Sequence, residues 1–236
     1  DRLPQTQVQY CEAQRPCTFV YCTGNHRRWE IMLSDDEYRS GNFPDDMLWP
    51  ILSRWVQPGD VHLWRRAAYR FHGLIAKTWK KDRVFLAGDA AHVTAPNGGY
   101  GMNTGIGDAI DLGWKLAAAI KGFGSAALLA SYERERRPVG YRNRQASERH
   151  TGVRIAIAEL YRSERDLDAL ARGIAALGNA ENESWGVEFG YRYDGVEPDP
   201  LRYEPTTAPG ARLPSTMLRD GTFLYDRLGP WFTLLC

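Results

Sequence analysis

The chain has 236 residues, of which 43% are hydrophobic and 25% are charged, values ordinary for a globular protein. Its 30 Lys and Arg residues balance 29 Asp and Glu residues, so a net charge of +1 gives no reason to expect a nucleic acid or an anionic membrane surface as a partner. No run of eighteen apolar residues occurs, which argues against a transmembrane helix. The N-terminus resembles neither a signal nor a transit peptide and lacks an initiator Met, so we expect a cytoplasmic protein whose sequence continues upstream.

The cysteines give little indication of chemistry. Four occur, with spacings that match neither a zinc site nor a CxxC redox motif: Cys11, Cys17, Cys22 and Cys236. We expect reduced thiols and no metal site. A disulfide between two of the first three stays open.

The first third of the chain predicts a β-rich region. Residues 17–33 form two strand-like runs around a glycine-containing turn, which indicates a hairpin. Residues 34–44 are acidic and polar and predict an exposed loop. Apolar residues at helical spacing predict a helix over 45–56, and residues 61–79 return to strand character.

The middle of the chain predicts a buried strand, a glycine-rich loop and a long helix. Residues 83–88 hold a short apolar run without alternation, which is typical of a strand buried on both faces in a parallel sheet. The helix is predicted to begin near Met102 and to end near Lys121-Gly122. One face of it carries the small and apolar residues that we expect in the core: Ile106, Ala109, Ile110, Gly113, Ala117 and Ile120.

The last part predicts two further helical stretches and a linker. Helical spacing covers residues 126–150, where Pro138 is expected to kink or divide the helix, and a separate helix at 153–177, closed by Gly178-Asn179. Residues 195–222 contain five prolines and predict an ordered linker. Apolar runs at 222–225 and 231–236 predict the opening of a β-containing unit, so we also expect sequence after Cys236.

Residues 88–103, which join the predicted buried strand to the long helix, have the most distinctive chemistry. Ligands of α/β sheets usually bind at this kind of junction, beyond the carboxyl end of a strand. Asp89 stands where a carboxylate can accept hydrogen bonds from ligand hydroxyls. Three glycines let the backbone approach a flat ring, because no Cβ intervenes: Gly98, Gly99 and Gly101.

The helix that follows adds to this pattern. Its start offers backbone N–H groups without helical partners and the positive end of the helix dipole. Pro96 stiffens the loop before it. Gly105 and Gly107 each cost about 1 kcal/mol relative to Ala in a helix, and a close neighbour would explain their presence.

Each of these features alone has an ordinary explanation. Gly-Asp after a strand is a common turn, and nearby glycines occur in many loops. Asp108 and Asp111 could simply complement the helix N-terminus. His92 alone would more often be a structural hydrogen-bonding residue than a catalyst.

In combination, the segment resembles the second flavin motif of the para-hydroxybenzoate hydroxylase-like flavoprotein monooxygenases. The parts of the motif stand in the family's order and spacing: Gly88 to His92, Pro96, Gly99 to Asn103, Asp108-Ala109, Leu112 to Ala117 and Ser131 to Pro138. Residues 25–30 and 190–194 are similar, more weakly, to the 3-(3-hydroxyphenyl)propionate hydroxylase and polyketide hydroxylase branch. Residues 209–214 resemble the beginning of a thioredoxin-like domain that larger members carry.

The resemblance implies an α/β (α+β) fold with four parts. Residues 1–75 would be part of a mixed-sheet substrate domain, and residues 76–150 the C-terminal part of a Rossmann-like FAD-binding domain. Residues 151–208 would form a helical segment and linker. Residues 209–236 would begin a truncated thioredoxin-like domain.

The implied activity is hydroxylation of a phenolic ring with NADPH or NADH and O2, through a flavin hydroperoxide. The residues implied for FAD are Gly88, Asp89, Pro96, Gly99, Gly101, Met102 and Asn103. The counterpart of Asp89 binds the ribityl chain, and that of Pro96, the implied catalytic residue, lies near the carbon that captures oxygen. Backbone N–H groups of Gly99 to Asn103 would face the flavin pyrimidine edge, where the helix dipole stabilises negative charge by about 1 kcal/mol.

Substrate contacts are less constrained. Arg28 and Trp29 could face the boundary between flavin and substrate, and Tyr69, Phe71 and His72 could line the pocket. Trp29 and Phe71 could equally be sheet core, and Arg28 a solvated charge. His26 or His72 could deprotonate a phenol, because histidine titrates near neutrality.

Two motifs of the family are not found in this sequence. One is the strand–GxGxxG–helix that seats the FAD pyrophosphate, and the other is an Asp-Gly motif that serves FAD and the nicotinamide cofactor. We therefore expect the chain alone to bind FAD weakly or not at all. Alternative hypotheses are a flavoprotein epoxidase, an oxygenase of polycyclic phenols, and an inactive remnant that serves as a structural or interaction module. A homodimer stays open.

Overall fold

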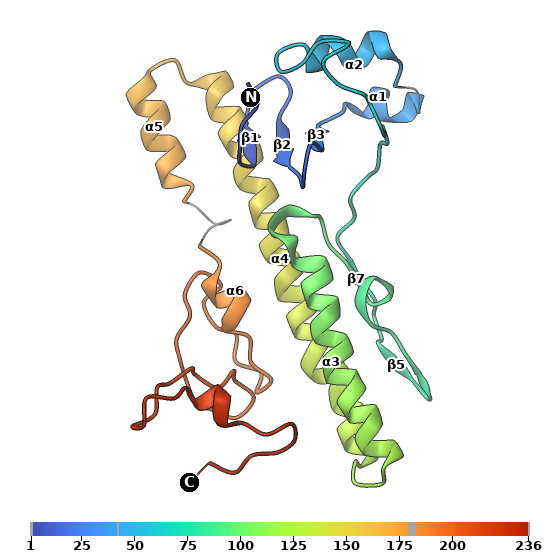
Figure 1. Cartoon of the computed structure of the whole chain (residues 1–236), viewed down its shortest axis with the longest axis vertical. Helices are drawn as coiled ribbons and strands as arrows, with labels where there is room; N and C mark the ends of the chain where they lie inside the picture. Colours follow the sequence, from blue (N-terminus) through green and yellow to red (C-terminus); the bar gives the residue numbers. More distant parts are fainter. Residues whose placement is uncertain (1, 42, 179–182, 236) are drawn as a thin grey trace. The chain divides into compact units, whose positions relative to one another are not determined.

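The computed structural model describes residues 2–41, 43–178 and 183–235 (Figure 1). Its helices (α), strands (β) and 3-10 turns (η) are, in chain order, β1 (Val8–Tyr10), β2 (Cys17–Tyr21), β3 (Arg27–Ile31), α1 (Asp35–Ser40), α2 (Asp45–Leu52), β4 (Leu74–Ile75), β5 (Lys80–Lys81), β6 (Val84–Phe85), η1 (Gly88–Ala90), β7 (His92–Val93), η2 (Asn97–Gly99), α3 (Tyr100–Ile120), α4 (Ala126–Ser163), α5 (Leu167–Ala176), α6 (Trp185–Phe189) and η3 (Leu224–Arg227). This mixture of helices and short strands is the α/β class that the sequence predicted.

The chain divides into two compact units. The first comprises Asp1–His72 and Thr151–Asn179, and the second comprises Gly73–His150 and Ala180–Cys236. The four-part division expected from the sequence, with a thioredoxin-like start at residue 209, stays a prediction.

The first unit contains an antiparallel sheet in the order β1-β2-β3. The predicted hairpin at 17–33 is confirmed, because β2 and β3 pair in register with Phe19 opposite Trp29. Phe19 is fully buried, and its ring meets that of Trp29 edge-on at 5.5 Å. The predicted helix at 45–56 is also confirmed, as α2.

The exposed loop predicted at 34–44 is wrong, because α1 forms there. Ser34 caps the helix by accepting a hydrogen bond from the Glu37 N–H, and the Glu37 side chain accepts one from the Ser34 N–H. Three acidic residues in the first turn complement the helix dipole. The acidic composition that suggested a loop was therefore a helix-start signal.

The strand predictions between residues 61 and 88 are largely wrong. Within the described part of 61–79, only Leu74 and Ile75 form a strand, β4, paired with β7, and Val61 makes a single bridge to Pro58. Residues 83–88 do not form a strand buried in a parallel sheet. Val84 and Phe85 make a two-residue antiparallel pairing with β5, and Val84 is 64% exposed. Apolar runs form long strands only where a neighbouring strand offers hydrogen bonds, and among the described residues the neighbours β5 and β7 are only two residues long.

Helices α3 and α4 form the frame of the second unit, and α3 runs antiparallel to the first half of α4 (Figure 1). The predicted long helix is confirmed, starting at Tyr100 instead of near Met102. Its predicted core face is wrong. Ile106, Ile110 and Ile120 are exposed, while polar residues of the opposite face are buried: Thr104, Asp108, Asp111 and Lys115.

Helix α4 is continuous through Pro138, so the predicted division there is wrong. Pro138 is exposed, and the carbonyl that loses its helical partner can be hydrated on that side. The predicted helix over 153–177 is in fact the end of α4 and a separate α5. Asp166 begins α5 by accepting a hydrogen bond from the Ala169 N–H at 2.8 Å. Asn179, in the predicted stop, lies outside the described residues.

The C-terminal segment contains few regular elements, as the prolines predicted. Residues 195–222 contain no helix, and their pairing in the described range is limited to single bridges such as Arg192–Ala211 and Met217–Phe223. The predicted strands at 222–225 and 231–235 are wrong: the first makes a single bridge at Phe223 and then enters the 3-10 turn η3, and the second lacks regular structure. Cys236 lies outside the described residues, and the other three cysteines form no disulfide among the described residues.

Candidate functional site

The first part of the predicted site is a single 3-10 turn. Residues Gly88–Ala90 form η1, closed by a hydrogen bond of 2.8 Å from the Ala91 N–H to the Gly88 carbonyl. Asp89 stands in the middle of this turn and is exposed. Among the described residues, nothing forms a hydrogen bond or an ion pair with its carboxylate. This carboxylate is therefore available to a ligand.

The second part is a glycine bend at the start of α3. Gly98 and Gly99 have φ angles of 82° and 70°, in the left-handed region that favours glycine. A Cβ on Gly98 would lie 2.4 Å from the Tyr100 ring and 2.9 Å from His150, whereas a Cβ on Gly99 would meet nothing within 4 Å. The inner side of the bend at Gly98 is therefore packed, and its outer side at Gly99 is open within 4 Å of an added Cβ.

The bend ends at a helix N-terminus that no side chain caps within the described ranges. Met102 and Asn103 in the first turn are exposed, and the Asn103 amide donates to the Gly99 carbonyl at 2.9 Å. The first-turn N–H groups and the positive end of the α3 dipole therefore face outward at the open side of the bend.

Two helical glycines have the close neighbours that the sequence predicted. A Cβ on Gly105 would lie 3.2 Å from the Cα of Gly88, so α3 and η1 touch backbone to backbone. A Cβ on Gly107 would lie 2.6 Å from Nη2 of Arg136. Both glycines are explained by what approaches α3 at these positions.

One buried carboxylate fixes η1 against α3. Asp108 is 0% exposed, and its Oδ2 accepts from the Gly88 N–H at 3.1 Å and lies 2.6 Å from Nε2 of His92. Its Oδ1 accepts from Nε of Arg136 at 2.9 Å. Burial opposes ionisation, but the hydrogen bonds from His92 and Arg136 outweigh it and lower the pKa of Asp108. We call Asp108, His92 and Arg136 the loop-end cluster.

Arg136 links this cluster to three other elements. It is 2% exposed, and besides Asp108 it donates to the Thr104 carbonyl at 3.1 Å and to the Tyr193 hydroxyl at 3.3 Å. The Tyr191 ring lies 5.6 Å from the guanidinium carbon. Burial raises the pKa of Tyr193 to about 12. The Gly190–Asp194 segment, singled out by resemblance, thus packs on the outer side of Arg136.

A second buried group lies one to two turns further along α3. Lys115 is 1% exposed, donates to Oδ2 of Asp111 at 2.7 Å and also contacts Glu135 of α4. Burial raises the pKa of Asp111 despite the nearby Lys115 ammonium. We call Asp111, Lys115 and Glu135 the far-end cluster. Both Asp108 and Asp111 lie beyond the first turn of α3, so the suggestion that they complement its N-terminus is wrong.

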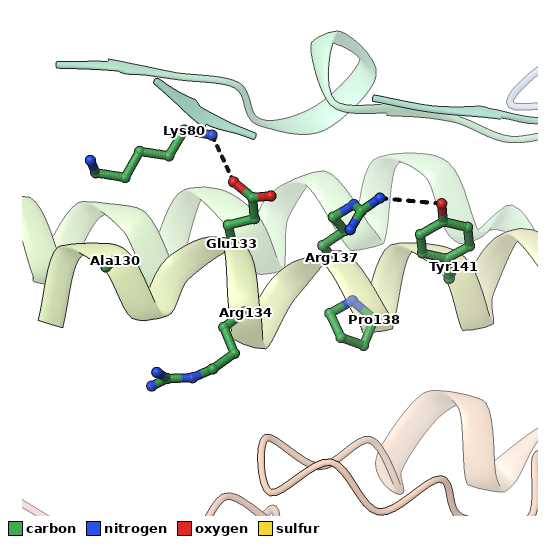
Figure 2. Close-up of a pocket in the computed structure, with 7 residues that line it drawn as sticks. All are labelled: Lys80, Ala130, Glu133, Arg134, Arg137, Pro138 and Tyr141. Carbon is green, nitrogen blue, oxygen red and sulfur yellow. Dashed lines mark hydrogen bonds between the residues drawn. The ribbon is translucent and has the colours of Figure 1, made fainter. Parts of the chain in front are cut away.

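A cavity of about 430 Å³ opens between β5 and the first half of α4, and no residue of the glycine bend lines it (Figure 2). Lys80, Arg134 and Arg137 bring positive charge to it, and Glu133 lies between them. The Glu133 carboxylate already accepts the N–H groups of Trp79 and Lys80, at 3.0 and 3.1 Å, so it anchors the β5–β6 hairpin. Nothing in the sequence predicted this groove, and we place the functional site at the bend, where a carboxylate and helix N–H groups stay available.

The predicted substrate residues belong to the first unit. Arg28 is exposed and pairs with Glu30 at 2.9 Å, and Trp29 packs against Phe19 as sheet core. Tyr69 and Phe71 are exposed, with rings 5.0 Å apart, and His72 is exposed as well. Because the glycine bend belongs to the second unit, their role at the flavin stays a prediction.

Comparison with known families identifies the family to which the chain belongs. The family described as FAD binding domain matches residues 24–147, which is more than half of the chain and includes the whole of Gly88–Asn103. The chain belongs to this FAD binding domain family. The glycine bend, the uncapped helix start and Asp89 are therefore parts of an FAD binding domain.

Relatives of the chain are flavin-dependent monooxygenases. It is 42% identical to the FAD-dependent monooxygenase opdD of Penicillium oxalicum over 65% of this chain and 33% of that protein. It is 32% identical to the 3-(3-hydroxy-phenyl)propionate/3-hydroxycinnamic acid hydroxylase of Mycolicibacterium smegmatis, over 99% of this chain and 42% of that protein. The crystal structure of the flavin-dependent monooxygenase PieE with FAD and substrate matches 91% of this chain and 44% of its own, with a TM-score of 0.76 and 26% identity.

The chain spans about three to four tenths of the length of the curated relatives that it matches. No helix in the described ranges is long and apolar enough to cross a membrane.

Sequence reasoning missed the residues that hold the site in place. Arg136, Tyr193 and Asn143 had no predicted role, although Arg136 lies in the family-like run from Ser131 to Pro138. The available signal was Gly107, because a costly glycine inside a helix indicates a side chain packed against it. The structural alternative for His92 is confirmed, since its ring is buried against Asp108 and Trp79.

Proposed function

We propose that this chain forms the flavin-holding part of an FAD-dependent monooxygenase that hydroxylates a phenolic ring, with NADPH or NADH as reductant and O2 as oxidant. The observation that supports this most strongly is the glycine bend at the start of α3. Its outer side is open, its helix N-terminus is uncapped among the described residues, and the Asp89 carboxylate nearby is available. Membership of the FAD binding domain family gives these features a common ligand.

Bound FAD would supply the redox and oxygen chemistry of the reaction. The chain's residues would then bind and orient it. Asp89 would accept hydrogen bonds from hydroxyls of the ribityl chain, and N–H groups from Gly99 to Asn103 would donate to the pyrimidine edge. The dipole of α3 would stabilise negative charge at that edge by about 1 kcal/mol, without rearrangement during the reaction. Pro96, exposed and without an N–H group, would leave an apolar surface beside the ring.

The substrate is proposed as a phenol on the basis of the relatives. The protein from Mycolicibacterium smegmatis, which aligns with nearly the whole chain, is named for two hydroxyphenyl acids. Arg28 and Trp29, with Tyr69, Phe71 and His72, remain our candidates for substrate contact. A cytoplasmic location and a homodimer also stay predictions.

The test uses the full-length gene product. Its visible spectrum should contain the bands of oxidised flavin, and a phenol should stimulate its consumption of NADPH or NADH. Comparing monocyclic phenols, polycyclic phenols and alkenes as substrates separates hydroxylation from the polycyclic and epoxidase alternatives. A colourless full-length protein that does not take up added FAD would contradict the proposal and favour the inactive remnant.

Asp89→Ala should lower flavin occupancy of the full-length protein, because the ribityl hydroxyls lose a charged acceptor. Asp226→Ala is the matched control. It removes one exposed carboxylate of the second unit that makes no side-chain contact among the described residues. Equal occupancy in the two variants would remove Asp89 from the site.

A further inference from the structure

We propose that Arg136 and Asp108 are positioning residues that set the place of Asp89 at the flavin, so that the C-terminal Gly190–Asp194 segment controls FAD affinity through them. The inference rests on the proposed function, because it concerns the same site. It adds a buried chain of contacts that begins at Tyr193 and ends at η1.

Asp108 holds η1 through two contacts. The same oxygen of Asp108, Oδ2, receives the Gly88 N–H and the His92 side chain. Gly88 directly precedes Asp89 and His92 follows it by three residues, so a single buried atom holds the chain before and after the exposed carboxylate. A shift of Asp108 would therefore move Asp89 directly.

The second step is the support of Asp108 itself. Its other oxygen, Oδ1, is held by Nε of Arg136 at 2.9 Å, and Arg136 also binds the Thr104 carbonyl in the second turn of α3. Arg136 thus fixes Asp108 and the start of α3 together. Asn143 lies seven residues after Arg136 on α4. It donates to the Thr104 hydroxyl at 2.7 Å and supports the same turn of α3.

The third step connects the C-terminal segment. The Tyr193 hydroxyl accepts from Nη1 of Arg136, and the Tyr193 N–H donates to the Gly210 carbonyl at 3.0 Å. The guanidinium therefore has a different element on each side: η1 and α3 through Asp108 and Thr104, and the C-terminal segment through Tyr193. Its five N–H donors in a rigid fork suit it to this task, which a lysine ammonium cannot reproduce.

The far-end cluster provides a matched control on the same two helices. Lys115 is as deeply buried as Arg136 and also joins α3 to α4, but its partners Asp111 and Glu135 belong to neither η1 nor the glycine bend. Removing either cation should destabilise the protein. Only removal of Arg136 should disturb Asp89.

The experiment compares Arg136→Met with Lys115→Met in the full-length protein. Apoprotein is titrated with FAD, its dissociation constant is measured by flavin fluorescence, and the thermal midpoint of each apoprotein is recorded. We expect both substitutions to lower the midpoint. Arg136→Met should raise the FAD dissociation constant at least about tenfold, and Lys115→Met should leave it within about twofold. Equal changes in the two variants, or none in Arg136→Met, would overturn the inference.

Two additions keep the result decisive. If Arg136→Met does not fold, Arg136→Lys and Lys115→Arg form a milder pair, in which the first should weaken FAD binding more than the second. Hydrogen exchange of the Gly88–His92 amides in the apoproteins should accelerate with Arg136→Met and not with Lys115→Met. This readout needs no flavin. If the wild type did not bind FAD but amide exchange still differed between the two variants, only the proposed function would be contradicted. If the wild type bound FAD but amide exchange did not differ between the variants, only the positioning role would be contradicted.

Discussion

The loop-end and far-end clusters solve the same problem, a buried cation between α3 and α4, in opposite ways. At the loop end, one carboxylate, Asp108, receives donors from three places, the backbone of η1, the β7 histidine and α4. At the far end, one ammonium, Lys115, faces two carboxylates. The hydrogen bonds lower the pKa of Asp108, whereas burial raises the pKa of Asp111.

This difference indicates what each cluster does. A buried ion pair contributes to stability only when further hydrogen bonds satisfy its remaining atoms. Asp108 meets that condition on both oxygens, so its charge is preferred in the folded state. The folded state does not favour the charge of Asp111 in the same way, because its cation, Lys115, also pairs with Glu135. The fold therefore depends most on ionic contacts at the loop-end cluster, which holds η1.

The largest expected effect contrasts Asp108→Ala with Asp111→Ala. Losing Asp108 leaves Arg136 buried without its carboxylate and frees the Gly88 N–H, which should cost about 3–5 kcal/mol of unfolding free energy. Losing Asp111 leaves Lys115 with Glu135 and should cost clearly less, about 1–2 kcal/mol. Urea unfolding of the two variants measures the difference. Equal losses of unfolding free energy in the two variants would contradict the contrast between the two clusters.

A second contrast uses two glycines of α3. In Gly107→Ala the new Cβ would lie 2.6 Å from Nη2 of Arg136, and displacing a buried guanidinium should cost about 1–3 kcal/mol. In Gly113→Ala the Cβ meets nothing within 4 Å, so higher helix propensity should stabilise the protein by up to about 1 kcal/mol. Thermal unfolding checks both signs. A neutral Gly107→Ala would mean that Arg136 moves aside freely.

These contrasts also mark how far the sequence could predict the structure. The glycine bend, Asp89 and the helix after it were predictable, because glycine conformations and helix starts are local properties. The buried face of α3 was not. Its apolar residues suggested a core of Ile106 and Ile110, but among the described residues the partner is α4, which offers charged and polar side chains. Periodicity identifies a face, and only the opposing surface decides which face is buried.

The strands failed for a related reason. The run at 83–88 has the composition of a buried strand, but a strand needs a neighbour, and among the described residues it has only the two-residue β5. The family resemblance predicted the family correctly because it rests on spacing within one continuous segment. It singled out residues 190–194, but it could not indicate that Tyr193 contacts Arg136 from 57 residues away.

Tyr193→Phe tests the outer contact of the loop-end cluster with a smaller effect. The substitution keeps the ring and removes the hydroxyl that accepts from Arg136, so it should cost about 0.5–1.5 kcal/mol. Tyr191→Phe is the control, because the Tyr191 ring lies near Arg136 and its hydroxyl makes no contact among the described residues. Urea unfolding near pH 7 suffices, because burial raises the pKa of Tyr193 to about 12. Identical stabilities of the two variants would remove the Tyr193 contact from the cluster.

The smallest effect is expected in the pH dependence, and it separates the clusters by the direction of their pKa shifts. Asp108 has a lowered pKa, so its ionised form adds stability that is present above the unfolded value of about 4 and is lost as the pH falls further. Asp111 has a raised pKa, so its ionised form costs stability at neutral pH. That cost disappears as the pH falls toward about 4.

The stability difference between the wild type and Asp108→Asn should therefore stay constant from about pH 7 to 4 and shrink below it. For Asp111→Asn the difference should change above about pH 4, in favour of the wild type as acid is added. The measurement is the free energy of unfolding in urea across this pH range. If the difference from the wild type changed over the same pH range in both variants, the contrast between the two carboxylates would be contradicted.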